Sequence, residues 1–167
     1  MGVFESVVDK LNEARKADPN AEHFETEVEQ DDIRVRVKAD DFGRLGIHIH
    51  ELSIEGPEPG GDLGECLHRQ ADALAQLDTP PLTHLKPIEI DGRLGAGVMR
   101  TKPDEIHRGH YYEAGLQGGR KVSIKRYHRD PETKDRSLAP FTATEETLDE
   151  VVDAIGGVLR ANPTSTD

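Results

Sequence analysis

Two histidines, His48 and His50, stand one residue apart in the stretch 45–52, where apolar and polar residues alternate and Glu51 follows directly. Residues two apart on a β-strand project from the same face, so both imidazoles could bind one metal ion. Exposed histidines on the polar face of a strand are, however, common in proteins that bind no metal. We therefore predict an ordinary solvated strand with no metal or other cofactor. His48 and His50 are the candidate ligands if the protein is instead a metal-dependent enzyme.

Other residue patterns that carry enzyme chemistry are missing from the sequence. It has no glycine-rich phosphate loop, nucleophile elbow, paired Cys-x-x-Cys or helical His-Glu-x-x-His. His107 and His110 are three residues apart, which places them on opposite faces of a regular strand. The one cysteine, Cys66, lies on an apolar helical face and is expected to be buried. We predict a non-enzymatic protein with no catalytic residue.

The charge of the chain is strongly negative but unevenly distributed. Its 167 residues include 33 acidic and 21 basic side chains, a net charge of −12, which on average repels nucleic acids and anionic membranes. The stretch 100–136 is an exception, because ten Lys/Arg against six Asp/Glu give it a charge of +4 and leave −16 for the rest. No run of about 18 apolar residues and no signal-peptide pattern is present. With one cysteine as well, these features favour a cytoplasmic protein without a membrane partner.

Two segments, 24–29 and 33–38, alternate apolar with charged residues, which is typical of a β-hairpin. A two-residue turn at Gln30–Asp31 predicts these opposite pairs: Val28 with Ile33, Thr26 with Val35, Glu27 with Arg34, and Glu25 with Arg36. Opposite charges directly across a sheet are favourable. We therefore interpret the charges as a solvated sheet face rather than a binding patch.

The remaining periodicity predicts helices and further strands. The expected helices are 4–16, one that begins at the cap Asp62, and 144–161 with Thr142 or Thr144 as its cap. The further expected strands are 44–55, 84–90, 93–101, 106–115, 119–128 and a short one near Phe141. This pattern predicts an α+β fold in which a twisted antiparallel sheet has helices packed on one face, in the order α-β-β-β-α-β(3–5)-α. We expect a single domain at 1–161 and a flexible C-terminal tail at 162–167.

One part of the positive stretch has a recognisable order of residues. A strand, a tyrosine, an Asp-Pro-Glu turn, a short strand and a capped helix follow one another, carried by Val122, Ile124, Lys125, Tyr127, Asp130–Pro131–Glu132 and Phe141–Thr142. In this order 121–155 resembles the positive-cofactor family of transcriptional coactivators, which bind single-stranded DNA. The resemblance implies nucleic-acid contacts from the 119–128 strand, on the face shared by Lys125, Tyr127 and Arg129. Such side chains follow phosphates and stack on bases.

The order of elements along the whole chain is similar to that of the small acidic chaperones of type III secretion and their relatives. This second resemblance rests on element order, size and charge rather than on particular residues. It implies a homodimer that binds a protein partner. Our leading prediction is therefore a non-enzymatic protein with a role in protein–protein interaction or a chaperone-like role. Single-stranded nucleic-acid binding is the alternative, and a metal-dependent enzyme comes third.

Overall fold

The computed structural model describes residues 2–102 and 109–161. Its helices are α1 (Val3–Ala17), α2 (Leu63–Ala75) and α3 (Glu145–Arg160). Its strands are β1 (Phe24–Gln30), β2 (Ile33–Gly43), β3 (Gly46–Glu55), β4 (Asp78–Thr79), β5 (Leu82–Thr83), β6 (Lys86–Asp91), β7 (Ala96–Arg100), β8 (His110–Gln117), β9 (Lys121–Arg129), β10 (Arg136–Leu138) and β11 (Phe141–Ala143). Within these ranges no helix has the length and apolar character needed to cross a membrane. The tail predicted at 162–167 lies outside the described residues.

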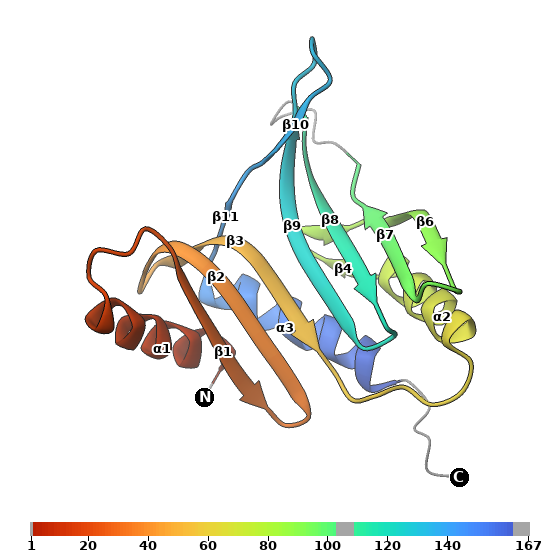
Figure 1. The fold of residues 1–167 in the computed structure, drawn as a ribbon, viewed down its shortest axis with the longest axis horizontal. Helices are drawn as coiled ribbons and strands as arrows, with labels where there is room; N and C mark the ends of the chain where they lie inside the picture. Colours follow the sequence, from red (N-terminus) through yellow and green to blue (C-terminus); the bar gives the residue numbers. More distant parts are fainter. Residues whose placement is uncertain (1, 103–108, 162–167) are drawn as a thin grey trace.

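Nine of these strands form one antiparallel sheet whose main path is β1-β2-β3-β9-β8-β7-β6. All three helices lie behind this sheet in Figure 1, so one face is covered and the other is open. The predicted α+β fold with helices on one face is thus confirmed. Asp62 caps α2 as expected, by accepting a hydrogen bond from the backbone N–H of Glu65. Of the two expected candidates Thr142 and Thr144, Thr144 caps α3 by accepting from the backbone N–H of Thr147.

The strand count between α2 and α3 differs from the prediction. We expected three to five strands, and the described residues contain eight. The four long ones, β6 to β9, correspond to predicted strands. Of the other four, β11 is the short strand predicted near Phe141. The strands β4, β5 and β10 were not predicted, because two or three residues are too few for an alternating pattern to be recognised.

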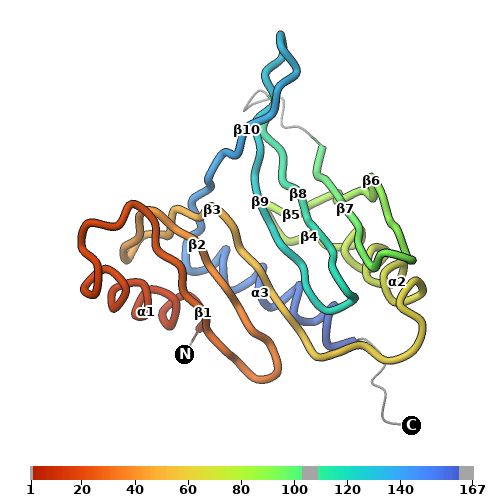
Figure 2. The backbone as a smooth tube through the Cα atoms, in the orientation of Figure 1, coloured from red at the N-terminus to blue at the C-terminus, as the bar shows by residue number. Residues whose placement is uncertain are grey.

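The sheet forks between β3 and β9. The two strands pair directly only from Leu52 opposite Ile124 to Glu55 opposite Lys121. Beyond that point they diverge, and the chain that returns from β9 toward α3 runs between them (Figure 2). On this path β10 pairs with β9 and β11 pairs with β3. The fork leaves a hollow on the open face, with Leu138 at the end of β10 beside it.

The core lies between the sheet and the helices. On the sheet side, β2 buries Ile33, Val35, Val37, Ala39 and Phe42, and β3 buries Ile47, Ile49, Leu52 and Ile54. In each strand the alternation skips one residue, after Ala39 and after Ile49. A strand keeps its apolar residues inward across such a skip only if an extra residue bulges out.

The register of the β1–β2 hairpin differs from the predicted one. The turn is at Asp31–Asp32 instead of Gln30–Asp31, so Val28 lies opposite Val35 and Gln30 opposite Ile33. Asp31 has a φ of 57°, the left-handed conformation that two-residue hairpin turns need and that aspartate tolerates. The predicted and the observed registers both keep apolar side chains inward, so alternation alone does not distinguish them.

Candidate functional site

The charges on the open face of β1 and β2 are paired with one another. Arg34 lies 2.7 Å from Glu27 and 3.1 Å from Glu29, and Arg36 lies 3.5 Å from Glu25 and 3.2 Å from Glu27. The two predicted pairs therefore form, although diagonally rather than directly across. Because these side chains are well exposed, each pair contributes at most about 1 kcal/mol. This part of the sheet is a solvated face, as predicted.

Two bulges interrupt the ladder between β2 and β3. Ala39 pairs with Ile49, whereas the residue beside each of them, Asp40 on β2 and His50 on β3, is left out of the pairing. The two extra residues therefore flank the same buried pair. Both side chains project onto the open face, as does His48. The bulges thus bring a carboxylate from one strand to two imidazoles on the next.

Asp40 lies between the two imidazoles. Its Oδ1 is 2.5 Å from His48 Nδ1, and its Oδ2 is 2.8 Å from His50 Nε2. One potential ligand atom from each residue can be chosen so that all three lie within 4.8 Å of one another. The side chains are between 23% and 40% exposed, so an ion can reach them from solvent. In the part of the chain that the structure describes, this is the one group of at least three such residues.

The cluster holds its carboxylate in the charged form. Burial by itself raises the pKa of the Asp40 carboxyl, but hydrogen bonds with His50 and His48 outweigh it and leave the pKa below its ordinary value. Asp40 is therefore an anion at neutral pH, which is the form that binds metals. Two imidazoles and one carboxylate suit zinc and the other divalent transition metals, and three protein ligands leave coordination positions open.

A further imidazole lies next to the cluster. The ring of His23, just before β1, is 5.2 Å from the ring of His50 and roughly perpendicular to it. His23 is exposed and reaches the open face from a third segment of the chain. It is close enough to approach a ligand held by His50, although it is not one of the three clustered residues.

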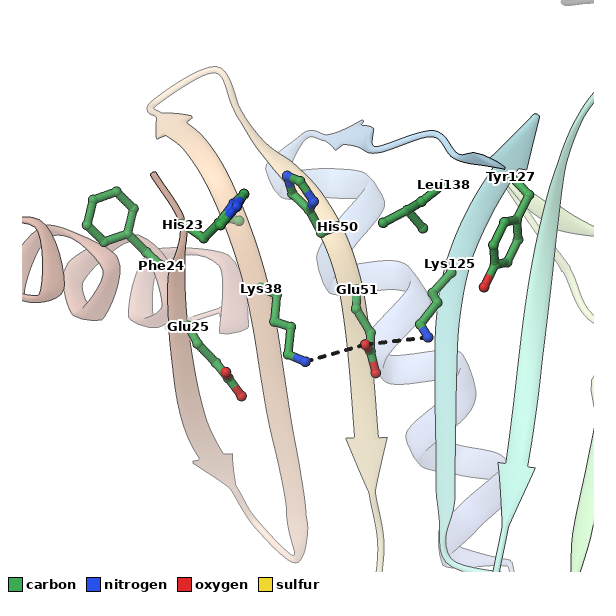
Figure 3. Close-up of a pocket in the computed structure, with 10 residues that line it drawn as sticks. His23, Phe24, Glu25, Lys38, His50, Glu51, Lys125, Tyr127 and Leu138 are labelled. Carbon is green, nitrogen blue, oxygen red and sulfur yellow. Dashed lines mark ion pairs between the residues drawn. The ribbon is translucent and has the colours of Figure 1, made fainter. Parts of the chain in front are cut away.

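A groove of about 500 Å³ begins at His50 and follows the fork of the sheet. Figure 3 shows His23 and His50 at one end, Lys125 and Tyr127 on the opposite wall, and Leu138 between the two. Glu51 lies between two lysines, 3.7 Å from Lys38 and 3.7 Å from Lys125. The groove therefore combines imidazoles, lysines and apolar side chains, and it shares His50 with the candidate metal cluster.

The three residues predicted for nucleic-acid binding alternate along β9 but line two different hollows of the surface. Lys125 and Tyr127 line the groove, whereas Arg129 lines a separate cavity. The ring of Tyr127 stacks on Tyr111 at 5.9 Å, and the Arg136 guanidinium lies over the same ring at 4.2 Å. These contacts occupy surfaces that base stacking would use. Lys125 is also engaged by Glu51, so the geometry gives the nucleic-acid prediction little support.

The other residues with possible chemistry lie elsewhere. His110 and His128 are neighbours on β8 and β9, with rings 4.7 Å apart, and His107 falls outside the described residues. Cys66 is buried on α2, as predicted. Sequence reasoning missed Asp40, whose role depends on the pairing of two strands. The skipped positions after Ala39 and Ile49 were the available signal.

Comparisons with known proteins identify no family and no relative of this chain. No family model matches the chain, and neither a curated protein nor a solved structure matches it.

Proposed function

We propose that this protein binds a divalent transition-metal ion through Asp40, His48 and His50. The observation that supports the proposal is the pair of bulges, which places a charged carboxylate within hydrogen-bonding distance of both imidazoles. The proposal departs from the metal-free strand predicted from the sequence, because that prediction weighed the two histidines without Asp40. It assigns a binding role and no reaction.

The position of the cluster suggests what the ion does. Three protein ligands leave room for water or for a donor atom of another molecule. His50 belongs both to the cluster and to the groove. A molecule that lies in the groove can therefore reach an open coordination position, and the ion serves as the recognition point of a binding site.

The experiment is a titration of chelator-stripped protein with Zn²⁺ by calorimetry, repeated with Co²⁺ as a spectroscopic probe. We expect one ion per chain, a cobalt spectrum that differs from that of the hydrated ion, and affinity that falls on acidification because imidazoles bind metals only when neutral. The His48→Ala/His50→Ala variant is expected to bind neither ion. His68→Ala, which removes an exposed histidine from α2, is the control and should bind as the unmodified protein does. Unchanged stoichiometry in the double variant would exclude this site.

The protein partner and homodimer expected from the sequence are a second proposal. The observation in their favour is the end of the sheet at β6, where Ile88 is 55% exposed on an edge strand. An exposed strand edge with an apolar side chain can pair with a second strand. A cytoplasmic location, suggested by the single cysteine, also remains a proposal.

Light scattering tests the dimer. We expect a mass twice that of one chain, and a shift toward the single-chain mass in Ile88→Lys, because a charge on the edge opposes pairing. Leu45→Lys, at the β2–β3 turn where Leu45 is 91% exposed, is the control and should remain dimeric. A single-chain mass over a wide range of protein concentration would contradict the proposal.

A further inference from the structure

A second cavity, of about 840 Å³, lies at the opposite side of the open face from the metal cluster. Its lining comes from β6, β7, β8 and the end of β9. Four of the lining residues are cations, namely Lys86, Arg100, Lys102 and Arg129. None of the other described lining residues is acidic. In a chain with a net charge of −12, such a concentration of positive charge is unusual.

One carboxylate neutralises part of this charge. Glu113 Oε2 accepts from Arg100 Nε at 2.9 Å and from an Arg136 side-chain nitrogen at 2.8 Å. Two guanidiniums thus share a single negative charge, which leaves a surplus of positive charge beside the cavity. Among the described residues, Glu113 is also the one carboxylate that pairs with a cation of the lining. The guanidiniums are held in place and still able to attract an anion.

A tyrosine hydroxyl at this cavity has a proton without an acceptor. Tyr111 is 4% exposed, and no described residue offers an acceptor in hydrogen-bonding geometry to its buried hydroxyl. The Arg136 guanidinium lies beside it, and hydrogen bonding to the Tyr111 oxygen and to Glu113 raises the pKa of Arg136. Because a guanidinium can only donate, the hydroxyl proton stays unpaired, which costs free energy that a bound acceptor would recover.

We propose that this cavity binds the phosphate group of a small molecule, with Lys86, Arg129 and Arg100 supplying charge and the Tyr111 hydroxyl donating a hydrogen bond. Arginine and lysine together with a hydroxyl donor are the groups that bind phosphate in proteins. A small ligand fits better than a nucleic-acid strand, because Tyr111 and Tyr127 stack on each other and Arg136 lies over Tyr127. The site is separate from the proposed metal cluster and does not depend on it.

The test uses calorimetry at low ionic strength with the full chain in excess chelator, so that no metal contributes. Inorganic phosphate and phenyl phosphate are the small probes, and a labelled oligothymidylate is the nucleic-acid probe. We expect saturable binding of phenyl phosphate at one site, weakened at least about tenfold in Lys86→Gln/Arg129→Gln because charge-assisted hydrogen bonds are lost. Arg44→Gln removes an exposed arginine from the β2–β3 turn and should leave the affinity unchanged.

Tyr111→Phe separates a binding role from a structural one. It should weaken phenyl phosphate binding about tenfold, since a hydrogen bond to a charged group is lost. The midpoint of thermal unfolding should change little, because the hydroxyl proton has no acceptor among the described residues of the free protein. Absence of saturable binding to either small probe, binding of the oligothymidylate alone, or unchanged affinity in the double variant would each overturn the proposal.

Discussion

Replacing Asp40 by asparagine is expected to weaken Zn²⁺ and Co²⁺ binding by at least about 100-fold. Asparagine has nearly the same shape, so the bulge on β2 can persist, but the anionic ligand is gone. Loss of a residue that merely orients a metal ligand costs about 10- to 100-fold in affinity, and Asp40 is proposed as a ligand itself. Calorimetric titration of the stripped variant measures the effect.

Asp41→Asn is the matched control for this substitution. Asp41 is the next residue on β2, it is exposed, and its Oδ1 accepts a hydrogen bond from the Phe42 backbone N–H. Asp41 lies opposite His48 in the strand pairing, but it is not one of the three clustered residues, so removing its exposed charge should leave metal affinity within about threefold of the unmodified value. Equal affinities in the Asp40 and Asp41 variants would mean that Asp40 is not a ligand.

The buried residue at the centre of the two bulges is expected to matter most for stability. Ile49 is fully buried and lies opposite both Ala39 on β2 and Phe141 on β11. Ile49→Ala should lower the free energy of unfolding by about 2–5 kcal/mol, through lost burial and the cavity left behind. Denaturant unfolding measures the change.

The control for the core substitution comes from the same hairpin. Leu45, in the β2–β3 turn, is 91% exposed, so Leu45→Ala should change the free energy of unfolding by less than about 0.5 kcal/mol. A loss of similar size in both variants would show that β2 and β3 do not pack as described. A small loss for Ile49→Ala alone would place that residue outside the core.

Local patterns in the sequence were sufficient to predict most elements, and their relative placement was harder. Period-two alternation predicted the strands at β1, β2 and β3, and Asp62 and Thr144 predicted two helix starts. The hairpin register was wrong because alternation is unchanged when the pairing slips by two residues. The observed turn places Asp31 in the left-handed conformation. The preference of aspartate for such turn positions is a weaker sequence signal than the hydrophobic alternation.

The candidate site could be predicted only in part, because it too depends on the register between strands. His48 and His50 share a face through simple alternation, which the sequence shows directly. Asp40 joins them because a skip on β2 and a skip on β3 flank one pair, Ala39 and Ile49. Each skip is visible in the apolar pattern, but their juxtaposition requires the register between the strands. Asp40 can therefore be identified as the third ligand only once the pairing of β2 with β3 is known.

The most direct test of the metal proposal is a crystal structure of the zinc-loaded protein with anomalous scattering measured at the zinc edge. We expect one anomalous peak on the open face, about 2.0–2.2 Å from His48 Nδ1, His50 Nε2 and an Asp40 carboxylate oxygen. Water or a donor from the groove should complete the coordination. The metal proposal would be contradicted if the zinc ion were bound elsewhere, such as at His110 and His128, and this cluster were empty.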